Sequence, residues 1–173
     1  MREVTTLILN GPPASGKSAV ARALQVVRHR EHNELCLHVQ LDAFEGMMPR
    51  GVALGAADFT TGVQSMLAAV RALAEGNVGL IVELVARNDA SVRQIISDLL
   101  GQSLAARPSP IWVTLLAGDA ERSARNRARG SERTVPTATE LDPRLVASSR
   151  LVMRTDEHTV DEVVLAIDRI LGA

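Results

Sequence analysis

The sequence predicts an α/β fold of three layers, in which helices cover both faces of a mostly parallel, five-stranded sheet. Short apolar runs of strand length alternate along the chain with longer segments of helical periodicity. The run 78–85 is almost continuously apolar and is interrupted by Glu83, as expected of a central strand buried on both faces. With 173 residues, of which 46% are hydrophobic, the chain has the size of a single domain with one continuous core.

The individual elements follow from the same periodicity. The predicted strands are short and apolar, and they cover residues 4–9, 35–41, 78–85, 111–116 and 151–154. The predicted helices show apolar stripes at helical spacing, and they cover residues 17–30, 59–75, 92–100, 119–129 and 159–171. The last helix begins with Thr159 and has Glu162 three residues later, the pattern of a capping box.

A phosphate-binding motif follows the first predicted strand. Residues 11–18 match G-x-x-x-x-G-K-[ST] and stand between a strand and a helix. In such a loop, backbone N–H groups and the helix N-terminus face a concavity that fits a β-phosphate. Lys17 would reach the β- and γ-phosphates, and the Ser18 hydroxyl would complete a Mg²⁺ shell. The predicted nucleotide-binding residues are Gly11, Pro12, Pro13, Ala14, Ser15, Gly16, Lys17, Ser18 and Ala19, together with Arg125 from the arginine-rich segment described below.

The motif makes this a predicted three-layer P-loop NTPase or kinase fold, and the rest of the chain favours a kinase. Lys17 is the single lysine, so the sequence cannot contain the N-K-x-D motif by which GTPases recognise guanine. We expect one P-loop kinase domain over residues 1–173 that uses ATP and Mg²⁺ and phosphorylates a small-molecule hydroxyl acceptor. Segment 43–75 would shape the acceptor site, and segment 119–135 would form a lid.

Two carboxylates are candidates for binding the acceptor or the metal ion near the phosphates. Asp42 follows the second strand at its carboxyl end, where open α/β sheets bind ligands, and we expect it to orient the acceptor hydroxyl and take its proton. Alternatively, it caps the following turn. Glu83 is expected near the end of the third strand, where it could hold Mg²⁺ through water, contact the acceptor or form a structural ion pair.

The predicted lid is rich in arginine. Four of its arginines follow the spacing i, i+3, i+7 and i+11, so they would share a helix face if the helix persists: Arg122, Arg125, Arg129 and Arg133. Such a face could close over ATP and neutralise the charge that develops on the transferred phosphoryl group, with Arg129 and Arg133 as catalytic candidates. The alternative is a solvated face in which Glu121 and Arg125 pair.

Composition limits the partners and the location. The formal net charge of −1 gives no overall attraction to nucleic acid, and only 2% of the residues are aromatic and able to stack on bases. No stretch approaches the ~20 apolar residues of a membrane span, and the run 4–9 is too short for a signal sequence. The single cysteine, Cys36, fits a reducing compartment, so we expect a cytoplasmic protein. The four histidines lack metal-ligand spacing and are expected in ordinary surface or core positions, although His158 follows the last strand.

Several short segments together resemble the chloramphenicol phosphotransferase-like proteins. These segments are Ile8-Leu9-Asn10-Gly11 before the loop, 37–44 with Asp42, Met48-Pro49, Trp112-Val113 and Ala128-Arg129-Gly130. The resemblance implies transfer of the ATP γ-phosphate to a hydroxyl of a small molecule, for which an antibiotic such as chloramphenicol is one candidate. It also implies that Asp42 is the base, that Lys17 and Ser18 serve phosphate and Mg²⁺, and that Arg129 and Arg133 belong to the lid.

The chain departs from that family pattern in places, and other functions stay open. Pro12-Pro13 replaces small polar residues, Glu83 stands in place of an aspartate, and Arg133 lies one residue further from Gly130. The alternatives are a metabolite kinase of the shikimate or gluconate kinase type, a polynucleotide or nucleoside kinase, and a nucleotide-binding regulatory module without transfer activity.

Overall fold

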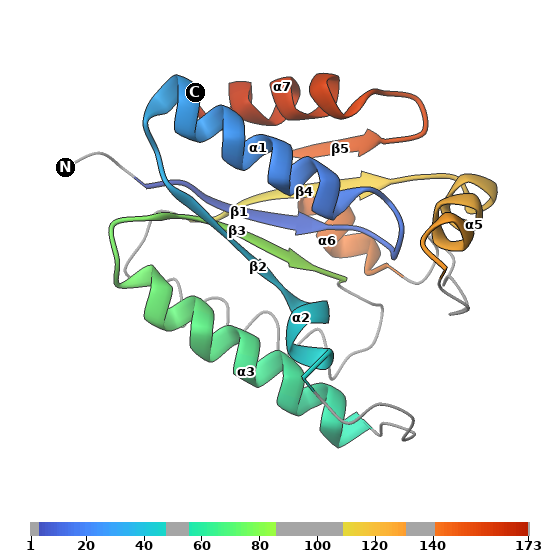
Figure 1. The fold of residues 1–173 in the computed structure, drawn as a ribbon, viewed down its shortest axis with the longest axis horizontal. Helices are drawn as coiled ribbons and strands as arrows, with labels where there is room; N and C mark the ends of the chain where they lie inside the picture. The colour runs from blue at the N-terminus through green and yellow to red at the C-terminus, as the bar shows by residue number, and fades with distance from the viewer. Residues whose placement is uncertain (1–3, 48–55, 86–108, 131–140, 173) are drawn as a thin grey trace.

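The computed structural model describes residues 4–47, 56–85, 109–130 and 141–172. Five strands in these ranges form one sheet in the order β2-β3-β1-β4-β5, and all four pairings are parallel. The strands are β1 (Thr6–Asn10), β2 (Cys36–Gln40), β3 (Gly79–Leu84), β4 (Ile111–Leu116) and β5 (Leu151–Arg154). Figure 1 shows that their carboxyl ends point toward the short helix α2 and the helix α5. The predicted α/β fold with a five-stranded sheet is confirmed, and all strand pairings in the described residues are parallel.

Helices cover both faces of this sheet. Their bounds are α1 (Lys17–His32), α2 (Leu41–Glu45), α3 (Ala56–Ala74), α5 (Asp119–Ala128), α6 (Pro143–Ser148) and α7 (Val160–Leu171). Helices α1 and α7 lie together on one face, and α3 lies on the other, which gives the three layers (Figure 1). The predicted helical stripe 92–100 lies outside the described residues. The short helices α2 and α6 were not predicted.

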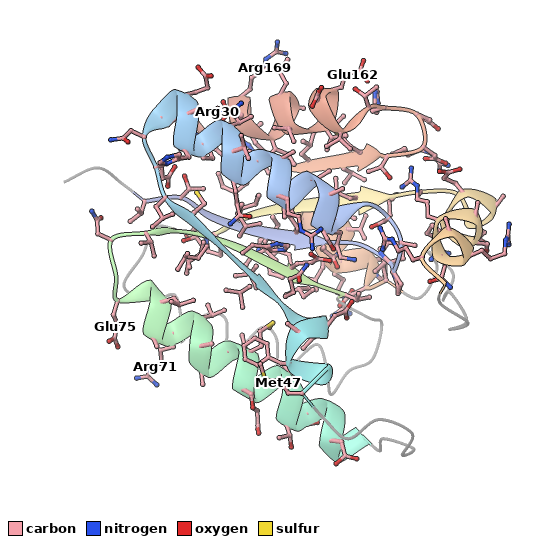
Figure 2. The ribbon with its side chains drawn as sticks, viewed as in Figure 1. Arg30, Met47, Arg71, Glu75, Glu162 and Arg169 are labelled. Atoms are coloured by element: carbon pink, nitrogen blue, oxygen red, sulfur yellow. The ribbon has the colours of Figure 1, made fainter. Side chains whose placement is uncertain are left out.

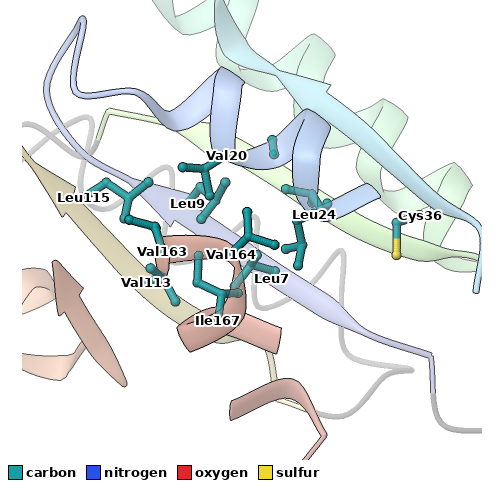
Figure 3. Close-up of a cluster of buried hydrophobic side chains, with 12 residues drawn as sticks. Leu7, Leu9, Val20, Leu24, Cys36, Val113, Leu115, Val163, Val164 and Ile167 are labelled. Carbon is teal, nitrogen blue, oxygen red and sulfur yellow. The ribbon is translucent and has the colours of Figure 1, made fainter. Parts of the chain in front are cut away.

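The face under α1 and α7 holds one of two hydrophobic clusters. Successive strand residues point to opposite faces, so Leu7 and Leu9 of β1 share this side. Val20 and Leu24, four residues apart on α1, pack onto them, and α7 adds Val163, Val164 and Ile167. Figure 3 shows these side chains meeting between the two helices and the sheet. This packing fixes the start of α1, and therefore the loop before it, over the end of β1.

The second cluster fills the opposite face. Ile8 of β1 and three alternate residues of β3, Leu80, Val82 and Leu84, pack against α3. All six residues of β3 are buried, as predicted for a strand covered on both sides. Arg71 of α3 and Glu162 and Arg169 of α7 are exposed and project from the outer sides of these helices (Figure 2).

Helix ends agree with the sequence signals where those signals are local. Thr159 accepts a hydrogen bond from the backbone N–H of Glu162, and the Glu162 carboxylate accepts from the Thr159 N–H, so the predicted capping box is present.

None of the helices in the described ranges combines the length and the apolar character that a bilayer crossing requires.

Candidate active site

The phosphate loop spans residues 11–18 and joins β1 to α1. Gly16 is the N-cap of α1 with φ of 91°, a left-handed conformation that glycine adopts readily. Gly11 is required by a close approach, because a Cβ atom there would lie 2.2 Å from the Leu115 carbonyl oxygen. The Ser15 N–H donates to the Pro12 carbonyl at 3.2 Å, which closes the turn.

The inner side of this loop suits an anion. The first turn of α1 contains no acidic residue of its own, and the positive end of its helix dipole faces the loop. The buried Ser15 hydroxyl lies against Gly11 and has no hydrogen-bond partner among the described residues. A buried hydroxyl without a partner is costly, and a phosphate oxygen in the loop would supply one.

Lys17 folds back over the loop that it follows. Its Nζ atom donates to the carbonyl oxygens of Gly11 at 2.9 Å and Pro12 at 3.1 Å, and it lies 4.0 Å from Glu83 Oε1. Burial lowers the pKa of Lys17, whereas the negative charges of Glu83 and Asp42 raise it. The Lys17 ammonium group is therefore buried at the loop, and its partners in the protein compensate only part of the cost of burying its charge. Phosphate oxygens would compensate the rest.

Glu83 lies beside Lys17, at the carboxyl end of β3. Its Oε1 atom accepts from the Ser18 hydroxyl at 3.0 Å. Its Oε2 atom accepts from His38 Nε2 at 2.9 Å and Gln40 Nε2 at 3.0 Å. Burial raises the pKa of Glu83, but these hydrogen bonds and the Lys17 charge outweigh it and bring the pKa to about 2, so Glu83 is ionised.

Ser18 and Glu83 provide two oxygen ligands suited to Mg²⁺. A hydroxyl and a carboxylate are among the ligands this ion prefers, and it usually completes its shell with water and phosphate oxygens. The sequence prediction named both residues as metal candidates, and the structure brings them into direct contact. The structural ion pair considered as an alternative for Glu83 is also present, because Lys17 is its neighbour.

Asp42 lies at the same edge of the sheet on a different element. Strand β2 ends at Gln40 rather than continuing to Leu41, and the chain turns directly into α2, whose second residue is Asp42. Its side chain is exposed, and its charge acts on buried Lys17. The structure therefore places a solvent-accessible carboxylate near the loop.

The arginines of the predicted lid have three different environments. Arg122 is 1% exposed and donates to Asp119 Oδ1 at 2.6 Å, and its charge lowers the pKa of Lys17. Arg129 is exposed at the C-cap of α5, and its charge lowers the pKa of Lys17. Helix α5 ends at Ala128, and Gly130 follows with φ of 67°, so the described helix does not reach the predicted length; Arg133 lies outside the described residues.

Arg125 connects α5 to the phosphate loop. Its guanidinium group donates to the Thr155 carbonyl at 2.8 Å and to Thr155 Oγ1 at 2.9 Å, and it reaches the Ala14 carbonyl at 3.5 Å. The Glu121–Arg125 pair considered for a solvated face is also present at 2.8 Å. Arg125 is therefore held against the loop as well as paired on the helix.

Sequence reasoning missed three side chains of this site: His38, Gln40 and Thr155. The Thr155 hydroxyl lies 2.7 Å from the Ser15 carbonyl and 3.2 Å from the Leu116 carbonyl, so it ties the loop to the end of β4. His38 and Gln40 are two residues apart on β2, a spacing that places both on one face of the strand. The sequence shows that spacing, but it does not show that both side chains bind the Glu83 carboxylate. His158, noted from the sequence, is exposed after β5.

The parallel sheet and the loop at the end of β1 have the arrangement of a P-loop fold. Comparison with known proteins specifies the class as that of the P-loop phosphotransferases. The family model described as chloramphenicol phosphotransferase-like protein matches residues 4–161, so the chain belongs to the chloramphenicol phosphotransferase-like family. No curated protein matches it in sequence.

Solved structures with the same fold include several kinases. The Mycobacterium tuberculosis APS kinase in complex with AMPPNP and APS superposes with a TM-score of 0.74 at 15% identity, covering 99% of this chain and 100% of that chain. The Deinococcus radiodurans tunicamycin resistance protein gives 0.65 at 21% identity, with 99% and 96% covered. Shikimate kinase from Acinetobacter baumannii in complex with shikimate gives 0.60 at 15% identity, with 97% and 93% covered. At these identities the likeness concerns the fold.

Proposed function

We propose that this protein transfers the γ-phosphate of ATP to a hydroxyl group of a small molecule, with an antibiotic such as chloramphenicol as the first candidate acceptor. The observation that carries the proposal is the juxtaposition of buried Lys17, Ser18 and ionised Glu83 at the phosphate loop. Family membership supports transfer to a small acceptor. The whole chain, residues 1–173, would act as one kinase domain.

In the proposed reaction the loop residues bind and orient the nucleotide. Backbone N–H groups of the loop and the Lys17 ammonium hold the β- and γ-phosphates, while Arg125 helps to fix the loop from α5. Ser18 and Glu83 would hold Mg²⁺, which when bound neutralises charge on the phosphates. Arg129 at the end of α5, and Arg133 beyond it, would stabilise the charge on the transferred group.

Asp42 is the better candidate for the base than Glu83. Glu83 has a pKa of about 2 and accepts hydrogen bonds from three side chains, so it has little tendency to take a proton. Asp42 is exposed, lies near the loop and carries a carboxylate without such a cage of donors among the described residues. We therefore propose that Asp42 binds the acceptor hydroxyl and that segment 43–75 contributes to the acceptor site.

Calorimetry and an acceptor panel test the proposal. The wild type is expected to bind ATP in the presence of Mg²⁺, and Lys17→Ala is expected to weaken this binding and remove turnover. Arg22→Ala removes an exposed charge from the same helix and serves as the control, with binding unchanged. ADP formation is then compared, as relative kcat/KM, for chloramphenicol, tunicamycin, shikimate and gluconate.

The outcomes separate the alternatives. Preference for shikimate or gluconate would indicate a metabolite kinase. Tight ATP binding without turnover on any acceptor would favour a regulatory module, and absence of ATP binding would overturn the proposed function.

A further inference from the structure

The two oxygen atoms of the Glu83 carboxylate contact different parts of the fold. Oε1 faces the phosphate loop, where Ser18 donates at 3.0 Å and Lys17 lies at 4.0 Å. Oε2 faces β2, where His38 and Gln40 donate at 2.9 and 3.0 Å. One oxygen is thus directed to the nucleotide side, and the other is attached to the neighbouring strand.

The pairing of β2 with β3 explains this attachment. The two strands run parallel, with Gln40 opposite Glu83 and His38 opposite Ile81, so Gln40 and His38 lie on the same face as Glu83. The His38 side chain is 9% exposed and the Glu83 side chain 10%. An ionised carboxylate only accepts hydrogen bonds, so Nε2 of His38 carries the hydrogen in this contact.

We propose that His38 and Gln40 are positioning residues that hold the Glu83 carboxylate by Oε2 and so keep Oε1 turned toward Ser18 for the metal ion of the bound nucleotide. This inference rests on the proposed nucleotide site. It assigns to strand β2, which lies outside the loop motif, the function of positioning Glu83. The same strand leads into α2 and Asp42, two residues after Gln40. One strand would then set the geometry of both the metal side and the acceptor side of the site.

The physical basis is the rotational freedom of a glutamate side chain. Glu83 has three rotatable side-chain bonds, and its carboxylate would otherwise have to be ordered when the metal binds. Residues that hold a metal ligand by its second polar atom typically change metal affinity by about 10- to 100-fold when mutated. The two donors from β2 restrain this carboxylate before any ligand arrives.

The test measures the Mg²⁺ requirement of nucleotide binding, without turnover. AMPPNP binding is titrated by calorimetry at increasing Mg²⁺, and again with EDTA. His38→Leu removes the donor and is expected to raise the half-saturating Mg²⁺ concentration by roughly 10-fold or more, while binding with EDTA stays close to the wild type. His38→Gln supplies an amide N–H in place of the ring N–H and is expected to restore most of the wild-type requirement. His29→Leu, an exposed histidine of α1, is the matched control.

A second variant keeps the test decisive if His38→Leu does not fold. Gln40→Leu removes the other donor, and it is expected to shift the Mg²⁺ requirement in the same direction. The inference is overturned if folded His38→Leu and Gln40→Leu need no more Mg²⁺ than the wild type, or if binding with EDTA weakens equally. Should the wild type itself bind AMPPNP neither with nor without Mg²⁺, the proposed function fails as well.

Discussion

Asp42 and Glu83 lie at one edge of the sheet but have opposite surroundings. Glu83 is 8% exposed and enclosed by donors, whereas Asp42 is exposed in the first turn of α2. Enclosure by donors stabilises a carboxylate as an anion and suits it to hold a cation. An exposed carboxylate can approach a bound acceptor and accept a proton, and this difference divides the two proposed roles.

The role of Asp42 gives the first prediction. Asp42→Asn is expected to lower kcat by roughly 10²-fold or more, because an amide of the same shape cannot take the proton. ATP affinity should change little, since Asp42 does not form part of the loop. Steady-state kinetics and calorimetry measure the two effects. Asp161→Asn, at the exposed second position of helix α7, is the control and should retain full turnover. Full turnover of Asp42→Asn would remove Asp42 from the mechanism.

The second prediction concerns the hydroxyl group of Thr155. Its Oγ1 atom contacts the Ser15 carbonyl and accepts from Arg125, so it connects the loop to two other elements. Thr155→Val keeps the shape and removes the hydroxyl, and we expect ATP affinity to fall by roughly 5- to 10-fold, corresponding to about one hydrogen bond. Thr155→Ser keeps the hydroxyl and should bind like the wild type. Equal affinities of the valine and serine variants would contradict this positioning role.

Helix α1 has different functions at its two ends. Its first residues, Lys17 and Ser18, belong to the proposed phosphate site, while Arg28 near its other end is buried among acidic partners. Arg28 Nε donates to Glu34 at 2.8 Å, and Nη1 donates to Asp168 of α7 at 3.0 Å. Arg28 thereby joins α1, α7 and the start of β2 at the edge of the sheet opposite the phosphate site.

This separation along α1 gives the third prediction. Arg28→Met leaves Glu34 and Asp168 without their shared cation, and it should lower the free energy of unfolding by about 3 kcal/mol. ATP affinity of the folded variant should stay unchanged, because at about 1.5 Å per residue the site lies about 16 Å away along the helix. Urea denaturation and calorimetry test both statements.

The control for this variant lies two residues along the same helix. Arg30→Met, at the exposed position labelled in Figure 2, should change stability by no more than about 0.5 kcal/mol. A loss of ATP affinity in folded Arg28→Met would show that the two ends of α1 are coupled.

At the scale of the whole molecule, each end of the parallel strands carries a group of oppositely charged side chains that are buried or partly buried. The carboxyl edge carries Lys17 and Glu83, and the opposite edge carries Arg28, Glu34 and Asp168. Burial raises the pKa values of all three carboxyl groups, but their hydrogen bonds and cationic neighbours outweigh it, so each pKa is lowered. Ionised carboxylates therefore stabilise the domain at both edges.

The acid stability of the domain gives the fourth prediction. Because the pKa of Glu83 falls on folding from its ordinary value of 4.5 to about 2, its stabilising contribution is complete above pH 4.5 and is lost as pH falls toward 2. Without divalent cations, the difference in free energy of unfolding between wild type and Glu83→Gln should shrink over this range, by at most about 1.4 kcal/mol per pH unit. Urea denaturation at a series of pH values measures it, and a difference independent of pH would contradict the assignment.

Much of the fold could be predicted because its signals are local in the sequence. The apolar run around Glu83 predicted β3, and Thr159 with Glu162 predicted the start of α7; both are confirmed. Helices α2 and α6 were missed because five and six residues are too few to show a helical stripe. The predicted end of β2 was one residue too late, because apolar Leu41 continues the pattern of the strand although it begins α2, where it is buried.

The sequence could predict which residues belong to the candidate site, but it could predict their contacts only where the residues are consecutive. The loop from Gly11 to Ser18 is one contiguous motif, so its position follows from the order of residues along the chain. The contacts of Glu83 with His38 and Gln40 cross 45 and 43 residues, and that of Thr155 with Ser15 crosses 140. Spacing also suggested a common face for the lid arginines, but packing buried Arg122 and left Arg129 exposed.

The amino-acid sequence by itself determined the alternation of strands and helices and the phosphate loop, because periodicity and a contiguous motif depend on neighbours along the chain. Only the tertiary structure decided which groups surround Glu83, which arginines are buried and how Thr155 reaches the loop. Those contacts depend on which strands pair and in what register, and in this sheet β2 lies beside β3 and β4 beside β5.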